Sequence, residues 1–495
     1  MDRERRAAAE KITIHWEGRP VEACAGDDAA SALFAAGIHV LGRSRKFHRP
    51  LGLAGSFLAG VKGQVDGLPN QRLDQIPVRT GLKVRAQNVW PNGRLDLLRL
   101  AGLIPRRWLR GGFEHPAWLP GGSRRFQIWE SFLRMMAGGG DAVAADRPGS
   151  VLPGERLTVD IAVIGGGPAG RQAAATAAAS GRSVMLISRG REPGAIAQAL
   201  GAELPPLPSS VRLLAGCEAA ALYRHGRLLV CAPLDGGPAK LVAAGRLVLA
   251  TGRRSVPPLV AGADLPGVLD LRTAVGLLNR GIALGRAILI GTGDLAALGV
   301  RLGSLGADIV ATRPAAALSR IAGARHIGRA VFGAGNDNGN DLGCDCLIHA
   351  GPWRPDPALP FQARADGEFR LTAGELPLHI ELVGAAAEAG EPIVHGPKLD
   401  DQAMVCPCMD VPVEEIRHLL GAGHNHVEEL KRLTGCGMGP CQGFPCWDLL
   451  AAALAAITRR SPESFGHPSY RPPRGALTLG QAAGLADLVQ PETSR

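Results

Sequence analysis

The chain has 495 residues, of which 46% are hydrophobic and 20% charged, a balance that excludes disorder over most of its length. It has no apolar run long enough to span a bilayer, and its N-terminus lacks the apolar core of a signal peptide. The net charge of +10 comes from scattered arginines rather than from a basic stripe, which argues against nucleic-acid binding. We expect a soluble cytoplasmic protein with no membrane segment.

The first ninety residues have the pattern of a β-grasp domain. Ile12, Ile14 and Trp16 alternate with polar residues, and a turn and a second short strand follow, which predicts a hairpin. A short apolar helix over residues 29–36 comes next. Residues 91–155 read as a connecting segment, with a weak helical pattern and a Gly-rich linker.

From residue 156 the pattern changes to alternating apolar strands and Ala-rich helices. Two strand–glycine loop–helix units predict an α/β chain with two tandem dinucleotide-binding folds. We assign the first fold to residues 156–275, completed by 378–400, and the second to 276–377. A small Cys-rich domain over 401–460 and a tail over 461–495 complete the chain.

The first glycine loop follows an apolar strand and opens a helix, the context of a dinucleotide fingerprint. Its first glycine, Gly165, permits a tight turn, and the second, Gly167, lets a pyrophosphate approach the backbone. The third, Gly170, lets the helix pack closely on the strand. The residues predicted to hold the cofactor here are Gly165, Gly167, Pro168, Ala169 and Gly170.

Two further segments belong to this first site. The strand after the helix normally ends in an acid that binds the ribose, but here it ends in Ser188 and Arg189. The ribose is then held differently, a phosphate is tolerated, or the site has lost its ligand. The small-residue turn Ala250-Thr251-Gly252 ends a later strand and is assigned to the same site.

The second glycine loop has Gly291 and Gly293, with Ala296 at the third position. The following strand again lacks a terminal acid and leads to Thr312 and Arg313. Two interpretations stay open, a site for NAD(P) or another adenine nucleotide, and a structural repeat that binds nothing.

Five of the ten cysteines lie between residues 406 and 446. Four thiolates suit a [2Fe–2S] cluster or a structural zinc, and unliganded core thiols are the third alternative. Predicted helix starts near Pro412 and Pro445 would favour thiolates. The proposed ligands are Cys406, Cys408, Cys441 and Cys446, with Cys436 as a spare or supporting thiol. The remaining cysteines are expected to be core residues.

Several of these motifs together resemble the α subunits of heteromeric sarcosine oxidases and their relatives, the opine oxidases, hydrogen-cyanide synthases and proline or hydroxyproline dehydrogenases. The matching segments span nearly the whole chain and are residues 44–50, 87–91, the Gly165 loop, 250–252, 264–267, the cysteine motifs and 471–473. The cysteine segment resembles a bacterioferritin-associated-ferredoxin-like domain.

The resemblance implies an FAD-dependent oxidoreductase acting on CH–NH donors as one subunit of a hetero-oligomer. The partner would be a smaller FAD-containing catalytic subunit, and this chain would relay electrons between FAD and a [2Fe–2S] cluster. Two rival functions are a scaffold subunit that has lost its flavin, and a self-sufficient NAD(P)H-dependent reductase. No catalytic residue is assigned.

The sequence departs from the family pattern in three places. We expect no folate-handling C-terminal domain like that of sarcosine oxidase, and the flavin-side loop is reduced to residues 193–196. The β-grasp domain also lacks ferredoxin cysteines. Counted with the plant-type spacing, the ligand positions correspond to Gly55, Gly60, Gly63 and Asp74. We therefore expect a β-grasp domain without a cluster.

Overall fold

The computed structural model describes residues 6, 9–55, 61–93, 95–103, 127, 131, 152–223, 227–333, 341–364, 376–439, 441–475 and 477–488. The chain forms two compact units. Unit 1 comprises residues 1–144, 255–353 and 391–468, and unit 2 comprises residues 145–254, 354–390 and 469–495. Two of the passages between the units lie within the short strands β14 (Arg253–Ser255) and β22 (Trp353–Pro355).

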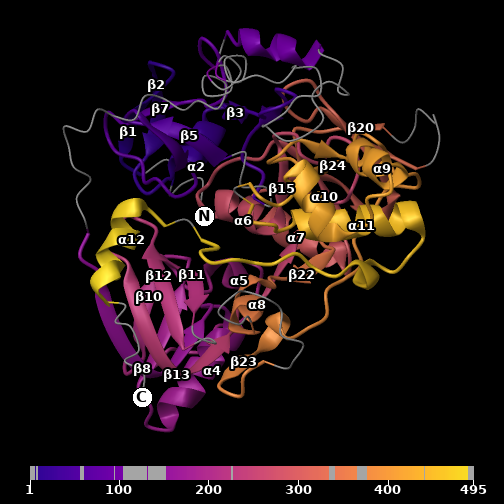
Figure 1. Cartoon of the computed structure of the whole chain (residues 1–495). Helices are drawn as coiled ribbons and strands as arrows, with labels where there is room; N and C mark the ends of the chain where they lie inside the picture. The colour runs from indigo at the N-terminus through magenta and orange to yellow at the C-terminus, as the bar shows by residue number, and fades with distance from the viewer. Residues whose placement is uncertain are drawn as a thin grey trace. The chain divides into compact units, whose positions relative to one another are not determined.

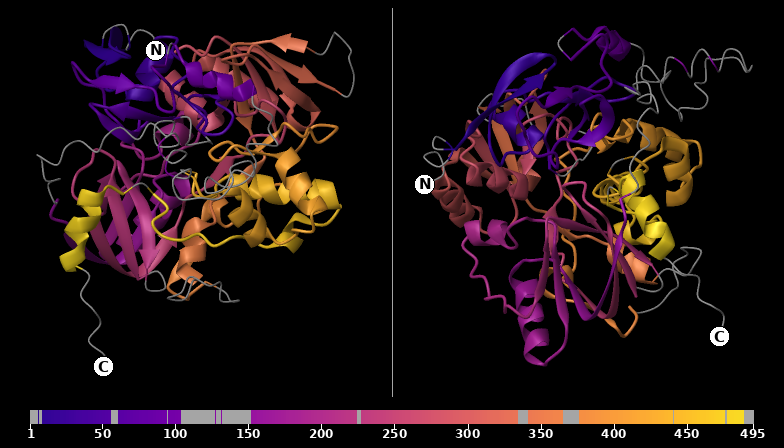
Figure 2. Two further views of the ribbon diagram at one scale, coloured as in Figure 1. Left: turned by 45° about the horizontal axis from the view of Figure 1, so that its top comes forward. Right: turned by 90° about the vertical axis from the view of Figure 1, so that its left-hand side faces the viewer.

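Unit 1 begins with the predicted β-grasp sheet, drawn in indigo in Figures 1 and 2. The hairpin and the helix are confirmed. Asp28 caps helix α2 (Ala29–Ala35) by accepting a hydrogen bond from the Ser31 N–H at 2.8 Å. The strand order is β2-β1-β7-β5-β6, with β1 and β7 parallel. The strands are β1 (Lys11–Trp16), β2 (Arg19–Cys24), β5 (Lys62–Val65), β6 (Leu68–Arg72) and β7 (Lys83–Arg85).

Short elements complete this part of unit 1. They are the two-stranded pair β3 (Gly42–Arg43) and β4 (Pro50–Leu51) and the 3-10 helix η2 (Leu97–Leu103). The connecting segment predicted over 91–155, with its weak helix, lies largely outside the described residues.

The second glycine loop belongs to a parallel four-stranded sheet of unit 1, in the order β15-β21-β16-β17. Its strands are β15 (Val268–Asp270), β16 (Arg286–Gly291), β17 (Asp308–Pro314) and β21 (Cys346–Ala350), with helices α6 (Leu271–Asn279) and α7 (Leu295–Ser304). Because β15 pairs with β21, this sheet begins at Val268 rather than after the predicted boundary at 276.

An antiparallel sheet packs into the same core. It contains β18 (Leu318–Ala322), β19 (Arg329–Phe332) and β20 (Asp341–Gly343), and the 3-10 helix η4 (Ala315–Ala317) precedes it.

The Cys-rich segment of unit 1 is mainly helical, and Figure 1 shows its helices in orange and yellow. A small hairpin precedes them, and helix starts at Val413 and Cys446 agree with the predicted ones. The elements are β24 (Met404–Cys406), β25 (Val411–Pro412), α9 (Val413–Gly421), α10 (Val427–Thr434), α11 (Cys446–Thr458) and η6 (Pro462–Phe465).

Unit 2 contains the first dinucleotide fold, as a seven-stranded sheet with the path β10-β9-β8-β13-β12-β11. Strand β23 (Ile380–Leu382) pairs in parallel with β13, whereas residues 391–400 of the predicted completion over 378–400 belong to unit 1. The other strands are β8 (Glu155–Ile164), β9 (Val184–Ser188), β10 (Arg212–Ala215), β11 (Cys217–Tyr223), β12 (Leu228–Pro233) and β13 (Lys240–Leu249).

Helices cover this sheet, and the C-terminal tail packs on it. Helix α4 (Pro168–Ala179) begins with proline at its first turn, a favoured position, and its alanines pack on β8 and β9. Residues 474 and 475 donate to the Ala220 carbonyl of β11, so this part of the tail lies against the sheet. Figure 2 shows α12 (Leu479–Leu485) in yellow beside the magenta sheet. The remaining elements are α5 (Ala195–Ala199), α8 (Ala358–Arg364), η5 (Gly384–Ala386) and η7 (Ala486–Leu488).

Helix α8 packs on β11, so residues 358–364 belong with the first fold rather than with the predicted second one. No helix among the described residues is both long and apolar enough to cross a membrane.

Candidate metal centre and dinucleotide loops

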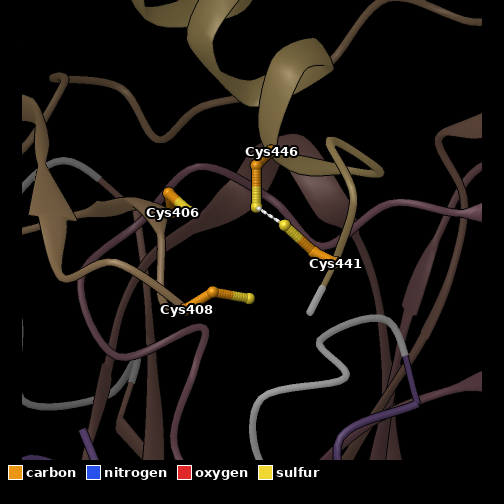
Figure 3. Close-up of side chains that lie close together, drawn as sticks. All are labelled: Cys406, Cys408, Cys441 and Cys446. Atoms are coloured by element: carbon orange, nitrogen blue, oxygen red, sulfur yellow. Dashed lines mark hydrogen bonds between the residues drawn. The ribbon is translucent and has the colours of Figure 1, made fainter. Parts of the chain in front are cut away.

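Four cysteine side chains converge at one point in the Cys-rich segment (Figure 3). Cys406 ends β24, Cys408 follows in the turn, Cys441 lies in a glycine-rich turn, and Cys446 begins α11. Their sulfur atoms all lie within 4.8 Å of one another, and all four residues are buried. The structure therefore brings together the four cysteines proposed as ligands.

The surroundings favour negative charge on these sulfurs. The Gly437 N–H donates to the Cys406 sulfur at 3.5 Å, and Cys446 lies at the positive end of the α11 dipole. Burial opposes a thiolate, but hydrogen bonds from neighbouring thiols lower the pKa of Cys406 well below its usual range. Hydrogen bonding to Cys406 raises the pKa of Cys441 and Cys446. A bound cation would replace the protons that those thiols hold.

Two glycines are required for this packing. A Cβ atom on Gly437 would lie 1.9 Å from the Trp447 ring nitrogen, and Gly437 has a φ of +74°. A Cβ on Gly439 would lie 2.7 Å from the Cys408 Cβ. Glycine at both positions lets the backbone approach the sulfurs closely.

The donor set fits a tetrathiolate metal site. In a tetrahedral zinc site, with bonds of about 2.3 Å, the sulfurs lie roughly 3.8 Å apart. A [2Fe–2S] cluster takes the same four thiolates and holds its two cysteine pairs farther apart. Four buried thiols that converge, with no histidine or carboxylate in the described group, fit either centre better than four separate core thiols.

The fifth cysteine of the segment, Cys436, is buried but lies outside this group of four. Its thiol lies 4.0 Å from the Cys446 carbonyl oxygen, and its own carbonyl accepts from the Trp447 ring N–H at 3.2 Å. It therefore contacts the residues that carry the candidate ligands. The other five cysteines are also buried, as expected of core residues: Cys24, Cys217, Cys231, Cys344 and Cys346.

An ion pair that our sequence analysis missed joins the β-grasp domain to this centre. Asp410, two residues after Cys408, is fully buried and has a φ of +54°. It accepts from the Lys46 backbone N–H at 2.7 Å and from Arg49 at 2.7 and 2.9 Å. Arg49 also donates to the Pro407 carbonyl at 3.3 Å. The only signal in the sequence was the motif at residues 44–50, whose partner cannot be identified without the fold.

The first glycine loop has the geometry of a pyrophosphate cradle. A Cβ on Gly165 would lie 2.1 Å from the Ala250 oxygen, and one on Gly170 would lie 1.8 Å from the Gly165 oxygen, so both glycines are fixed by packing. At Gly167 a Cβ would meet nothing within 4 Å. Gly167 also precedes the first turn of α4, where an anion is stabilised. The open side of Gly167 fits a dinucleotide.

The end of β9 carries no carboxylate for the ribose. Ser188 is 5% exposed. Its hydroxyl lies close to the glycine loop, because a Cβ atom added at Gly166 would be 2.9 Å from the Ser188 hydroxyl oxygen. The next residue, Arg189, is exposed. The turn at 250–252 begins at Ala250, which lies against the first glycine loop. Ala250 donates its N–H to the Ile164 carbonyl at 2.8 Å.

The second glycine loop carries two carboxylates. Asp294 caps α7 by accepting from the Ala297 N–H at 3.0 Å, so its negative charge occupies the helix end where a pyrophosphate would bind. Glu391 accepts from the Thr292 hydroxyl at 2.8 Å, inside the loop between Gly291 and Gly293. These residues do not fit a pyrophosphate, and the structural repeat is the better interpretation of this loop.

Three of the four β-grasp positions that correspond to ferredoxin ligands have other contacts. A Cβ on Gly55 would lie 2.2 Å from the Thr273 hydroxyl, and one on Gly63 would lie 2.9 Å from Leu73. Asp74 forms an ion pair with Arg72 at 2.7 Å. Gly60 lies outside the described residues. A thiolate has no room at Gly55 or Gly63 in this packing.

Three family models match separate parts of the chain. Residues 9–89 match a 2Fe-2S iron-sulfur cluster binding domain, residues 159–311 a pyridine nucleotide-disulphide oxidoreductase, and residues 400–485 the sarcosine oxidase A3 domain. They confirm the expected cofactor classes, a [2Fe–2S] cluster and a flavin or nicotinamide nucleotide. Residues 9–89 hold one cysteine, Cys24, so the thiols available to a cluster lie in the third region.

Individual relatives agree with these models. The chain is 27% identical over 579 aligned residues to the α subunit of sarcosine oxidase from Rhizobium meliloti (strain 1021), covering 96% of this chain and 58% of that protein. An opine oxidase polypeptide of the same strain is 37% identical over 91 residues, 18% of this chain and 19% of that polypeptide. The predicted resemblance to this group of proteins is confirmed. The chain spans less than two thirds of the length of either relative.

A solved structure confirms the fold. The L-proline dehydrogenase from P. horikoshii superposes with a TM-score of 0.69 at 20% sequence identity, covering 96% of this chain and 97% of that one. The expected α/β architecture with an N-terminal ferredoxin-like domain is therefore correct.

Proposed function

We propose that this chain, a relative of the sarcosine oxidase α subunits with oxidoreductase domains, is the electron-relaying subunit of a heteromeric amine or imino-acid dehydrogenase. The observation that carries the proposal is the convergence of four buried cysteine sulfurs within 4.8 Å in a chain that also contains a pyrophosphate cradle. A chain that holds both a two-electron carrier (a flavin) and a one-electron carrier (an iron–sulfur centre) can relay electrons between them. When bound, a flavin supplies two-electron chemistry and a [2Fe–2S] centre one-electron chemistry.

The residues of the chain have distinct roles in this proposal. Gly167 leaves room for the pyrophosphate, and the first turn of α4 binds it through backbone N–H groups. Gly165, Gly170 and Ala250 fix the shape of that loop. Cys406, Cys408, Cys441 and Cys446 hold the metal centre, while the Gly437 N–H stabilises charge on Cys406.

Oxidation of the amine itself is assigned to a smaller flavin-containing partner. The sequence near either glycine loop shows no set of base and carboxylate-binding residues that would select an amino acid. Substrates in the class of sarcosine, proline, hydroxyproline or opines follow from the relatives, and the structure does not choose among them.

The rival proposal of a flavin-free scaffold is favoured by one observation, the absence of a carboxylate at the end of β9. The rival of a self-sufficient NAD(P)H reductase is disfavoured by Asp294 and Glu391 at the second loop. Acid extraction of the anaerobically purified chain, with identification of the released cofactor, separates them. Released FAD supports the relay, and a chain with iron but no flavin supports the scaffold.

The partner requirement is tested by dye reduction. The chain, reconstituted with FAD and iron–sulfide, is assayed against the four substrate types with and without a co-expressed smaller flavoprotein. We expect dye reduction only with the partner. Turnover by the isolated chain at about 1 per second or faster, an ordinary enzyme rate, would contradict the relay assignment.

A further inference from the structure

A small cationic cavity of the β-grasp domain lies directly against the candidate metal centre. The cavity has a volume of about 40 Å³, and one of its lining residues is Cys408. Its charged lining residues are Arg43, Arg45 and Lys62, and no acidic side chain is found among the described residues that line it. All of these residues belong to unit 1.

Arg43 and Lys62 differ in how far their charge is already neutralised. Arg43 lies 3.6 Å from the Asp96 carboxylate, which is buried. Lys62, on β5, is half-buried, and no carboxylate lies within ion-pair distance of its ammonium group in the part of the chain that the structure describes. Within that part of the chain, Lys62 therefore carries a charge with no acidic neighbour, in a cavity that it shares with a candidate metal ligand.

The contact between the two elements is held rigidly. Asp410, two residues after Cys408, accepts from the Lys46 backbone and from Arg49, and Arg49 also donates to the carbonyl between Cys406 and Cys408. The ligand loop and the β-grasp domain are thus joined by buried, charge-assisted hydrogen bonds, which are the stronger kind. These hydrogen bonds hold the loop that carries Cys408 against residues 46 and 49 of the β-grasp domain.

A fixed positive charge beside a metal–thiolate centre has a defined physical effect. Four thiolates give the centre a net negative charge, and reduction adds one more electron. A nearby cation stabilises the reduced form more than the oxidised form, because the attraction grows with the negative charge. Cluster potentials depend on such neighbouring charges and on burial.

We propose that Lys62 sets the reduction potential of the metal centre on Cys406, Cys408, Cys441 and Cys446 by placing positive charge beside Cys408. The β-grasp domain, which has no cysteine ligand set of its own, thereby supplies a positive charge that acts on the centre of the Cys-rich segment. This inference rests on the proposed iron–sulfur centre.

The test uses the full chain, purified anaerobically, with Lys62→Met and Lys62→Arg. Lys83→Met is the matched control, because Lys83 is exposed on β7 of the same sheet and is not among the residues lining the cavity. Iron and sulfide are first measured in every protein. The midpoint potential of the centre is then determined by redox titration, followed by electron paramagnetic resonance and visible absorption.

We expect Lys62→Met to bind as much iron as the wild type and to shift the midpoint potential to a more negative value. Lys62→Arg should keep the wild-type potential, and Lys83→Met should not change it.

Equal potentials for Lys62→Met and Lys83→Met would overturn the inference. Loss of iron from Lys62→Met would also overturn it, because Lys62 would then be a structural residue. A wild-type chain that contains zinc or no metal would instead refute the proposed iron–sulfur function, and the inference would fall with it. The metal analysis of the wild type distinguishes the two failures.

Discussion

The Asp410 carboxylate accepts two hydrogen bonds from the Arg49 guanidinium, at 2.7 and 2.9 Å, although 361 residues separate the two in sequence. Asp410 is fully buried, and the Arg49 side chain is 16% exposed. Arg49 also forms an ion pair with Asp264. This network connects the β-grasp domain, the second dinucleotide fold and the loop of the candidate metal ligands within unit 1.

Replacing Asp410 by asparagine should destabilise unit 1 markedly. Asparagine weakens the charge-assisted hydrogen bonds from Arg49, which contribute about 1.5–3 kcal/mol each, while Arg49 keeps its ion pair with Asp264. Asparagine tolerates the positive φ of Asp410, so the backbone itself should not be strained. We expect a lower melting temperature and faster metal release to a chelator.

The matched control for that variant is Asp401→Asn. Asp401 pairs with Arg417 at 2.9 Å, but both side chains are about half exposed. Exposed pairs contribute roughly 0–1 kcal/mol, so this change should be close to neutral. Similar melting temperatures for the two variants would show that the Asp410 network does not stabilise the unit.

The four candidate ligands should respond alike to substitution. Cys408→Ser and Cys441→Ser should each reduce bound iron from about two atoms per chain to background and remove the visible charge-transfer bands, as expected for a four-thiolate [2Fe–2S] site. Cys436→Ser should be milder, since Cys436 lies outside the group of four. Cys24→Ser, a buried cysteine of the β-grasp domain, serves as the control.

Metal and sulfide analysis with visible absorption is the measurement. One zinc per wild-type chain and no iron would contradict the cluster. An equal loss of metal in Cys436→Ser would add that residue to the ligand set.

Gly167→Val should remove flavin without disturbing the fold. A Cβ at Gly167 meets nothing within 4 Å, and the φ of −72° is ordinary for any residue. The added side chain would instead occupy the space of the pyrophosphate. A clash of about 3 kcal/mol would weaken FAD binding roughly 100-fold.

The control is Gly303→Val, a position in α7 where a Cβ also meets no atom within 4 Å. Flavin content and melting temperature are measured for both variants. Retention of FAD by Gly167→Val, at wild-type stoichiometry, would place the flavin elsewhere.

Protonation of His349 should destabilise unit 1 in mild acid. Burial lowers the pKa of His349 to about 4, and its ring nitrogen lies 2.6 Å from the Ser255 hydroxyl. The folded-state pKa is below the ordinary value of about 6.5, so the unfolded chain binds the proton first as the pH falls. Stability is therefore lost between about pH 6.5 and 4, by about 2 kcal/mol at pH 5.

His349→Asn keeps a polar atom near Ser255 without a group that titrates in this range. Its melting temperature should fall less between pH 7 and pH 5 than that of the wild type. His418→Gln, a change on α9, should keep the wild-type slope. Parallel pH profiles for wild type and His349→Asn would refute the assignment.

Local patterns in the sequence were sufficient for the elements and the motifs. The β1–β2 hairpin, the helix capped by Asp28, the strand that leads into Gly165, and the starts of α9 and α11 were all predicted. Such features depend on residues close in the chain, where hydrophobic period, capping residues and glycine spacing act directly. The spacing of the four cysteines was also enough to propose them as one site.

The tertiary structure decided what surrounds those motifs. The sequence shows the same glycine pattern twice, and an added Cβ would meet no atom within 4 Å at Gly167 or at Gly293, yet only the fold places Asp294 and Glu391 against the second loop. Likewise, Arg49 and Lys62 are ordinary basic residues until folding brings one to Asp410 and the other to the cavity beside Cys408. Binding and charge depend on contacts between residues hundreds of positions apart, and no local period in one sequence encodes such contacts. Residue type and spacing therefore determined which chemical groups this chain carries. Long-range packing determined which of its two glycine loops can bind a dinucleotide and which of its cations lies beside the candidate metal centre.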